Sequence, residues 1–440
     1  MSITDTPATP QLHPPAPTTL DATGLNADLV QQLLLKTLYF GGELTGADLG
    51  KRLGLGFSVI EPLMEFLKQQ RLCEIAGGSV FGSASFRFRI TDAGRARTAL
   101  ILEQNQYVGV APVPLAQYVA YMRAFKETVP LRVTPERVRE AFKQIVISND
   151  ILDAVGPAVN AGHSLFVYGS PGNGKTMLAQ AIRKLLVGDI AIPQALEIEG
   201  SIVRVFDPVN HEELPLDQPE ESLSLTTQYD RRWVRCRRPL VMVGGELTMD
   251  ALELRYNALA RFYRAPIQLI ANGGILVIDD FGRQHCSPKD LLNRWIVPLE
   301  SRIDFLTLQS GQAFEIPFMV FLVFATNLKP TELADEAFLR RIQYKIFAES
   351  PKVEDFVRIF ENYCTSKQIP FDRSIVEYVL DTHYRPNKIA LRGCQPRDLI
   401  NQALALANYL GQPAVLTPAL MDAACNNYFV KERDVTATYA

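Results

Sequence analysis

Gly-Ser-Pro-Gly-Asn-Gly-Lys-Thr occupies residues 169–176, and this stretch decides the fold of the surrounding chain. The apolar run 164–168 before it predicts a buried strand, and residues 177–186 after it have the apolar spacing of a helix. Glycines allow consecutive backbone N–H groups to face an anion, and the new helix adds its positive end. The stretch is therefore a phosphate-binding loop that predicts binding of ATP. Its residues are Gly169, Ser170, Pro171, Gly172, Asn173, Gly174, Lys175 and Thr176.

Two acidic residues complete the expected magnesium site. Lys175 is expected to reach the β- and γ-phosphates, and Thr176 to offer its hydroxyl to Mg²⁺. The apolar run 275–278 predicts a central parallel strand, and Asp279 and Asp280 follow it directly. Asp279 is expected to hold Mg²⁺, while Asp280 stands where a carboxylate activates the attacking water. The other interpretation of the pair is a solvated strand end.

A third apolar run, residues 318–325, is followed by Thr326 and Asn327. Ligands of α/β sheets bind at the carboxyl edge of the strands, so Asn327 is expected beside the γ-phosphate, where it could orient the attacking water. An asparagine in such a place can also be only a cap or a turn residue.

Composition narrows the class of protein. The chain has 440 residues, a net charge of −3 and six scattered cysteines without a Cys-x-x-Cys pair. These features favour neither a polybasic nucleic-acid binder nor a zinc or disulfide framework. No signal peptide is recognisable, and the longest apolar run is too short to cross a bilayer. We therefore expect a cytoplasmic protein without a membrane span.

The order of phosphate loop, Asp-Asp strand and Asn-ended strand resembles the AAA+ ATPases over about residues 130–430. The resemblance implies an α/β P-loop fold with a parallel sheet, helices on both faces and a C-terminal α-helical lid. Most relatives have Glu where this chain has Asp280, which is one methylene shorter. Residues 269–274 before the Asp-Asp strand are similar to the helix-insert branch, which includes MoxR-like and magnesium-chelatase-type ATPases.

The same resemblance implies three arginines that act on ATP. Residues 335–342 match the segment that carries the arginine finger, with Arg341 as the first candidate and Arg340 as the second. A finger reaches ATP in the neighbouring subunit, which implies a homo-oligomeric ring such as a hexamer. Arg397 matches the sensor-2 position of the lid and would contact the γ-phosphate. The alternative for all three is an ordinary surface arginine.

The N-terminal part resembles a winged-helix domain. Helices are predicted over 25–40, from about 44 and over 58–70, with Pro62 in the first turn of the third. Residues 80–90 predict two strands about a Gly-Ser turn, and Thr91 or Asp92 caps a last helix. Because the third helix carries Glu61 and Glu65, we favour protein docking or a structural role over DNA binding.

These features divide the chain into six parts. We predict a disordered tail (1–23), a winged-helix-like α+β domain (24–104), a helical linker (105–133), an AAA+ core (134–350), an α-helical lid (351–430) and a short tail (431–440). The core carries an insertion at about 190–245, in which residues 196–206 predict a hairpin. An acidic patch and an arginine cluster about Trp233 follow, and they either engage a substrate or subunit or simply pair with each other. The patch consists of Glu212, Glu213, Asp217, Glu220 and Glu221, and the cluster of Arg231, Arg232, Arg235, Arg237 and Arg238.

The leading hypothesis for function is a ring-forming AAA+ ATPase that couples ATP hydrolysis to remodelling of a protein partner, as chaperone-like motors do. The competitor is a DNA-binding AAA+ regulator, transposition helper or initiator that uses the winged helix. A third hypothesis is a nucleotide-controlled scaffold with little turnover. The sequence identifies neither the partner nor the ring size.

Overall fold

The computed structural model of the protein describes residues 13–77, 82–128, 132–143, 145–162, 164–215, 229–333 and 339–429. The chain forms two compact units, each built from segments that are far apart in the sequence. Unit 1 contains residues 1–131, 186–277 and 284–322, and unit 2 contains residues 132–185, 278–283 and 323–440. The predicted tail 431–440 lies outside the described residues.

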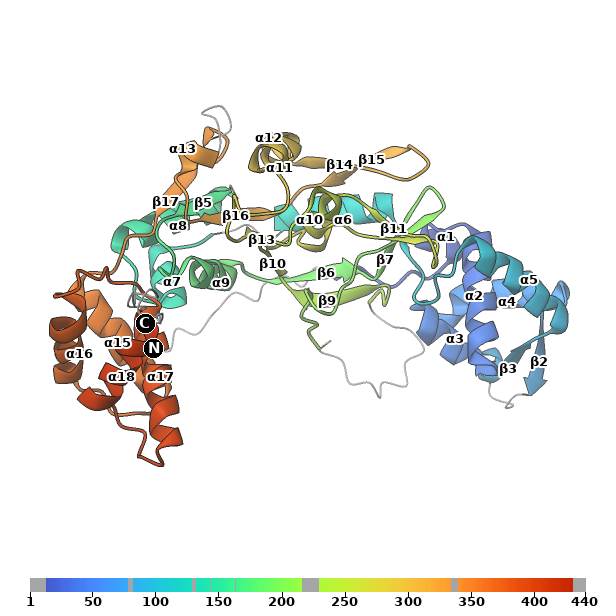
Figure 1. The fold of residues 1–440 in the computed structure, drawn as a ribbon. Coiled ribbons are helices and arrows are strands. Elements are labelled where there is room, and N and C mark those ends of the chain that lie inside the picture. Colours follow the sequence, from blue (N-terminus) through green and yellow to red (C-terminus); the bar gives the residue numbers. More distant parts are fainter. Residues whose placement is uncertain are drawn as a thin grey trace, which may run out of the picture. The chain divides into compact units, whose positions relative to one another are not determined.

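The first part of unit 1 has three main helices, a small sheet and a closing helix (Figure 1). Its elements are α1 (Leu20–Thr23), α2 (Ala27–Gly41), β1 (Leu44–Thr45), α3 (Gly46–Leu53), α4 (Phe57–Gln69), β2 (Cys73–Gly77), η1 (Ser83–Ser85), β3 (Arg87–Ile90) and α5 (Asp92–Gln104). Helices α1, α2, α3 and α5 begin at polar caps, whereas α4 begins after Gly56 without a side-chain cap. Thr45 and Asp48 form a reciprocal capping box on α3, and the Thr91 side chain accepts from the Gly94 N–H at the start of α5.

Two predictions for this region are wrong in detail. The strand that pairs with β3 is β2, at Cys73–Gly77, which lies before the predicted range 80–90; residues 78–81 lie outside the described part. The reason is burial, because register places Cys73 opposite Ile90 and both side chains are almost fully buried. Pro62 lies in the second turn of α4, since this helix already begins at Phe57, and its ring is on the exposed side.

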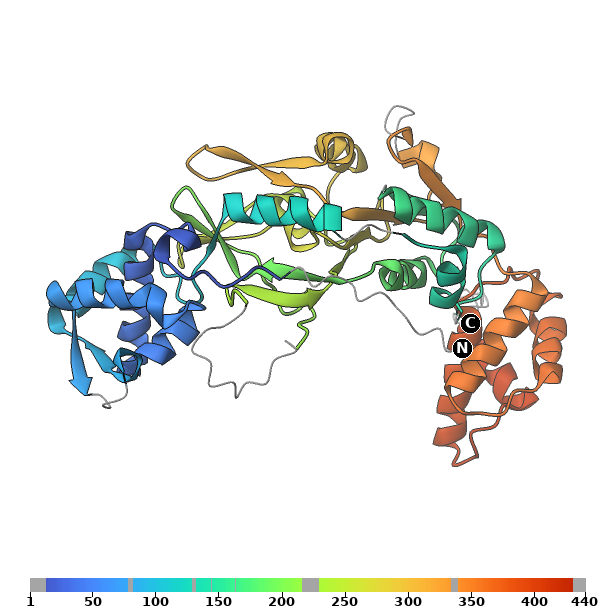
Figure 2. The same cartoon turned by 180° about the vertical axis from the view of Figure 1, so that it is seen from behind.

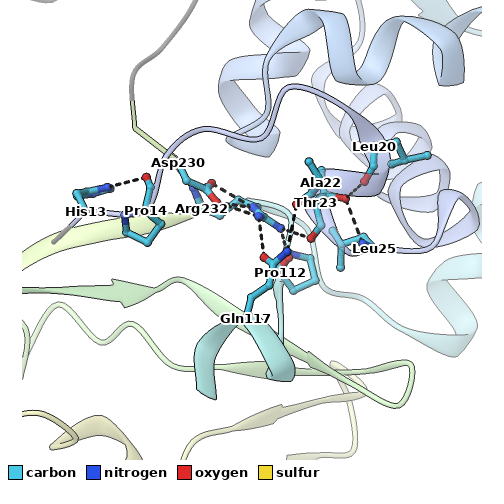
Figure 3. A network of polar contacts seen from close by, with 10 residues as sticks. All are labelled: His13, Pro14, Leu20, Ala22, Thr23, Leu25, Pro112, Gln117, Asp230 and Arg232. Carbon is cyan, nitrogen blue, oxygen red and sulfur yellow. Dashed lines mark hydrogen bonds and ion pairs between the residues drawn. The ribbon is translucent and has the colours of Figure 1, made fainter. Parts of the chain in front are cut away.

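The N-terminal tail is ordered from residue 13, so the predicted disorder is wrong for residues 13–23; residues 1–12 are not described. This segment lacks a core of its own but is held by Asp230 and Arg232 (Figure 3). The Asp230 N–H donates to the Pro14 carbonyl, and the Arg232 guanidinium donates to the carbonyl oxygens of Thr23 and Pro112. Arg232 also pairs with the Asp230 carboxylate at 2.8 Å, and both side chains are buried.

The second part of unit 1 is mainly β-structure. Its elements are β4 (Val113–Pro114), α6 (Leu115–Thr128), β6 (Asp189–Pro193), β7 (Ala195–Ile198), β8 (Ser201–Arg204), β9 (Trp233–Arg237), β10 (Leu240–Val243), η2 (Met249–Leu252), β11 (Arg255–Asn257), β12 (Phe262–Arg264), α10 (Ile267–Ile270), α11 (Pro288–Arg294), α12 (Ile296–Ser301), β14 (Ile303–Thr307) and β15 (Ala313–Pro317). One sheet has the order β11-β12-β8-β7-β4, and the pairs β6-β9 and β14-β15 are separate. The hairpin predicted over 196–206 is confirmed as β7-β8.

The arginine cluster of the predicted insertion is dispersed among different partners. Arg232 pairs with Asp230, Arg235 with Asp189 at 2.5 Å, and Arg237 with Glu212 at 3.0 Å. Only the last of these joins the cluster to the acidic patch, and residues 216–228 lie outside the described part. Trp233 is buried against Tyr121, with ring centroids 4.8 Å apart.

The P-loop sheet has the strand order β10-β13-β16-β5-β17, in which β13 is Ile275–Ile278 and β16 is Phe321–Thr326. Strand β5 runs parallel to both of its neighbours, β16 and β17. Every residue of β13 and β16 is buried, as predicted for central strands of this kind. Of this sheet, β5 (Leu165–Tyr168) and β17 (Tyr344–Phe347) belong wholly to unit 2, which also contains α7 (Pro135–Ala141), α8 (Asn149–Ala161), α9 (Lys175–Leu185) and α13 (Pro330–Leu333).

The C-terminal part of unit 2 is helical, and Figure 2 shows it from behind. It consists of α15 (Val353–Ser366), α16 (Arg373–Val379), η3 (Leu380–Tyr384), α17 (Gln395–Tyr409) and α18 (Pro418–Tyr428). These helices share one core, in which Phe356, Val376 and Leu399 are buried. The expected α/β P-loop fold with a helical C-terminal part is therefore confirmed. No helix within the described ranges is long and apolar enough to cross a membrane.

Candidate nucleotide site

The phosphate-binding loop joins β5 to α9, and all the residues of this site lie in unit 2. Three of its glycines have backbone angles in the left-handed region, with φ of +146° at Gly169, +80° at Gly172 and +78° at Gly174. A side chain at residue 169 would also come within 2.5 Å of the Ala348 carbonyl oxygen. The loop therefore needs glycine for its conformation and for its close packing.

Lys175 begins α9 and has an exposed fraction of only 7%. Its ammonium donates to the carbonyl oxygens of Gly169 and Ser170, both at 3.1 Å, and to Oδ1 of Asn327 at 2.5 Å. The lysine thus lies over its own loop, with its charge directed to the carboxyl end of β16. That is the place where an anion bound to the loop would meet it.

Asn327 links Lys175 to the acidic pair. Its Nδ2 donates to Oδ1 of Asp280 at 3.1 Å, while its Oδ1 accepts from the lysine. Asp280 has a left-handed φ of +49°, and its N–H donates to the Asp279 carboxylate at 2.9 Å. The structure therefore brings together three residues that were predicted from separate motifs. Their catalytic roles stay predictions.

The electrostatic setting of Lys175 follows from this arrangement. Burial lowers the pKa of Lys175, and the carboxylates of Asp279 and Asp280 act in the opposite direction. Arg392 adds to the lowering of that pKa, so a second cation lies within electrostatic range. The negative charges of phosphate groups would compensate both cations. The residues present therefore fit ATP.

The predicted metal ligands are Thr176 and Asp279. Thr176 is the second residue of α9, and its side chain lies outside the described part of the structure. Asp279 is half-buried, directly follows the buried strand β13 and precedes Asp280. A carboxylate and a hydroxyl at a phosphate-binding loop are ligands that Mg²⁺ accepts together with phosphate oxygens, so these residues fit the ion.

The lid touches the phosphate-binding loop directly. The Cys394 N–H donates to the Gly172 carbonyl at 2.8 Å, and the Gly393 N–H to Oδ1 of Asn173 at 3.5 Å. Asn173 in turn donates through Nδ2 to the Ala348 carbonyl at 3.2 Å. The start of helix α17 is therefore anchored on the loop that would carry the phosphates.

Arg392, which the sequence analysis missed, lies closer to the loop machinery than the predicted Arg397. Arg397 is exposed and its Nε donates to Asp398 at 2.8 Å. Arg392 donates to Ser350 Oγ at 2.9 Å, and its Cβ would lie 3.7 Å from a side chain at residue 172. The only signal available in the sequence was a basic residue directly before the Gly393-Cys394 entry to the lid helix.

The two finger candidates lie in the turn that precedes β17. Arg340 is exposed and Arg341 is half-buried. Residues 334–338, which belong to the segment matched by resemblance, lie outside the described part. Both arginines remain candidates on these grounds.

Comparison with protein families gives two matches. Residues 141–227, which contain the phosphate-binding loop, match the family described as magnesium chelatase, subunit ChlI. Residues 352–427, the helical lid, match a domain of unknown function, DUF8689. The first match agrees with the AAA+ resemblance predicted from the sequence, over the part of the chain that carries the phosphate-binding loop. The MoxR-like assignment and the winged-helix assignment stay predictions.

Comparison with solved structures gives distant similarities. NtrX from Brucella abortus in complex with ADP is 13% identical, with a TM-score of 0.38 over 72% of this chain and 60% of that one. The Holliday junction branch migration motor RuvB from Thermotoga maritima is 12% identical, with a TM-score of 0.35 over 63% of this chain and 68% of that one. A search of curated protein sequences finds no match. At similarities this low, the residue roles depend on the geometry of the site.

Proposed function

We propose that the protein is an ATP hydrolase in which Lys175, Asn327 and Asp280 form one connected unit at the phosphates. The observation that carries this proposal is the pair of hydrogen bonds from Lys175 to Asn327 and from Asn327 to Asp280. It joins the phosphate-binding loop, the Asn-ended strand and the Asp-Asp strand at one sheet edge, where ligands of such sheets bind. Lys175 can bind phosphate and the Asp280 carboxylate can activate water. A connection between these two groups suits transfer of a phosphoryl group to water.

The chemistry divides among these residues. Mg²⁺ bound at Thr176 and Asp279 would neutralise charge on the phosphate oxygens. Lys175 binds the β- and γ-phosphates, and Asp280 accepts a proton from the water that Asn327 orients. Asp280 has a shorter side chain than Glu, and its backbone has an unusual left-handed conformation with φ of +49°.

Hydrolysis is proposed to occur in a homo-oligomeric ring, with Arg341 or Arg340 reaching ATP of the neighbouring subunit. The work done is remodelling of a protein partner, with the N-terminal domain as the docking module. The surface of α4 supports protein docking, because its exposed side carries Glu61, Glu65 and Phe66, and Lys68 is paired with Glu65 at 2.6 Å. We place this activity in the cytoplasm on the basis of the six free, scattered cysteines.

The decisive experiment combines three measurements on the purified full-length chain. Wild type is expected to hydrolyse ATP with Mg²⁺, Lys175→Ala to bind no nucleotide, and Asp280→Asn to bind ATP without turnover. Asp280→Asn is then used to trap the partner, with Lys175→Ala as the matched control. Negligible wild-type turnover that Asp280→Asn does not change would leave a nucleotide-controlled scaffold instead of a motor.

DNA binding is the alternative function, and it can be tested with the same purified full-length chain. A protein that neutralises DNA phosphates loses affinity steeply as salt rises, because counterions are released. Binding of duplex DNA with such a salt dependence would favour the regulator, helper or initiator hypothesis. Absent or salt-insensitive binding would remove it.

A further inference from the structure

Unit 1 contains a cavity of about 650 Å³ that is separate from the nucleotide site of unit 2. Its walls come from α2, the end of α5, the β7-β8 turn, strands β11 and β12 with their connection, and Gln309. A volume of this size is typical of small-molecule sites. The residues of its wall that bear on a ligand are Asp28, Lys36, Glu197, Tyr256, Arg261 and Tyr263.

Lys36 is the unusual member of this wall. Its exposed fraction is 2%, and its ammonium donates to the Tyr107 carbonyl oxygen at 3.2 Å. Within the described ranges Lys36 forms no ion pair. A buried charge is costly unless an opposite charge compensates it. Burial accordingly lowers the pKa of Lys36 to about 8.

The acidic side chains on the wall are already engaged. Asp28 accepts from Nε2 of Gln32 at 2.7 Å, and Glu197 accepts from the Gly200 N–H at 2.7 Å. Arg261, in the β11-β12 connection, is exposed and adds a second cation at the cavity. The cavity therefore offers cations to a ligand more readily than anions.

Two tyrosines supply an apolar wall. The rings of Tyr256 and Tyr263 have centroids 4.9 Å apart, and the Tyr263 hydroxyl accepts from the Gln309 N–H at 3.0 Å. A fixed pair of rings beside a buried cation suits a ligand with an organic body and one anionic end.

We propose that this cavity binds a small organic anion, whose carboxylate or phosphate group pairs with the ammonium of Lys36 while its body lies against Tyr256 and Tyr263. This is a second ligand site, and it does not depend on ATP hydrolysis in unit 2. Arg261 is expected to contribute less than Lys36, because a cation at an exposed position is screened by water.

The test uses full-length protein carrying Lys175→Ala, which removes the other anion site. Benzoate and inorganic phosphate are titrated by calorimetry, so that the two arms distinguish a carboxylate from a phosphate source. Lys36→Met, which keeps a four-atom side chain but removes the ammonium, is expected to weaken binding at least about tenfold. Lys51→Met is the matched control, because Lys51 is an exposed lysine of α3 outside the cavity, and it should bind as the parent does.

The pH dependence separates charge pairing from a structural role. The charged groups at the cavity are Asp28 on α2, Glu197 on β7 and Arg261, and Tyr107 supplies the carbonyl. Burial lowers the pKa of Lys36 to about 8. Affinity for benzoate, whose charge is constant over this range, should be constant below that pH and fall about tenfold per unit above it, and it should show no such fall in Lys36→Met. Failure of both probes to bind, or equal binding by folded Lys36→Met, would overturn the proposal.

Discussion

The backbone N–H of Cys394 donates a hydrogen bond of 2.8 Å to the carbonyl oxygen of Gly172, so the first turn of the lid helix is seated on the phosphate-binding loop. A side chain at residue 172 would meet Sγ of Cys394 at 2.4 Å. The contact leaves no space between loop and lid for even one added carbon. A change of backbone at the loop must therefore be transmitted to α17.

Gly172→Ala is expected to weaken ATP binding and to loosen the lid. The new methyl group collides with Cys394 and also strains a residue with φ +80°, at a cost of about 1–3 kcal/mol for the backbone alone. Nucleotide affinity and limited proteolysis of the lid measure the two effects. Gly174→Ala is the matched control, because its φ is +78° and a methyl there meets no atom within 4 Å. Adding Cys394→Ala should restore part of the loss, and no restoration would mean that strain alone is responsible.

Asn327→Ala should reduce the rate of hydrolysis by about 10²-fold or more while ATP binding changes little. The reason is that Asn327 connects Lys175 to Asp280 but contributes nothing to the N–H groups of the loop. Single-turnover hydrolysis and equilibrium binding of ATP measure the two quantities separately. An equal fall in both would show that Asn327 serves only to position Lys175.

Arg341→Ala should leave nucleotide binding intact and stop hydrolysis, since an arginine finger contributes ~10³–10⁵ to the rate. Mixing this variant with Lys175→Ala is expected to restore some activity, because one kind of subunit supplies the finger and the other the intact loop. Arg340→Ala, one residue away, serves as the comparison. Mixtures that stay inactive would count against a site shared between subunits.

Arg232→Ala should lower the free energy of unfolding by about 3–5 kcal/mol, because it leaves the buried carboxylate of Asp230 uncompensated. Arg237→Ala is the control, because it breaks an arginine–carboxylate pair with Glu212 that is exposed. It should lower the free energy of unfolding by about 0–1 kcal/mol. Urea unfolding of both variants gives the comparison. Adding Asp230→Asn to Arg232→Ala should recover part of the lost stability.

Lys36→Met should remove a pH dependence of stability. The pKa of Lys36 is lowered from 10.5 to about 8 in the folded protein, so the unfolded chain binds more protons between these values. Wild-type stability should therefore gain a contribution as pH rises from about 8 to about 10. Unfolding curves at pH 7 and pH 10 should show this gain in wild type and not in the variant, relative to Lys51→Met.

Much of the nucleotide site was predictable because its signals are local. A loop with glycines at fixed positions, and strands that are apolar throughout, depend on residues that are neighbours in the sequence. The helix start at Thr91 was likewise predicted, since the side chain of this cap accepts a hydrogen bond from the backbone N–H three residues later.

The errors and omissions concern packing between distant segments. The strand before β3 was placed too late, because burial of Cys73 opposite Ile90 outweighed the local turn signal. The tail was expected to be disordered, yet Pro14 is held by Asp230, more than two hundred residues later. Arg392 was missed for the same reason, since its place near the loop depends on how the lid packs.

The two parts of unit 1 share strand pairing and core residues, which has a practical consequence for the preparation of fragments of this protein. Strand β4, which follows the first helical part, pairs with β7, and the core of that first part includes Ala195 and Ile202. The helices of this first part therefore do not form an independent domain that can be moved to another protein without the rest of unit 1. A truncation that stops near residue 105 would expose apolar side chains of this core and yield an aggregation-prone fragment. Fusion partners and tags are therefore better attached elsewhere.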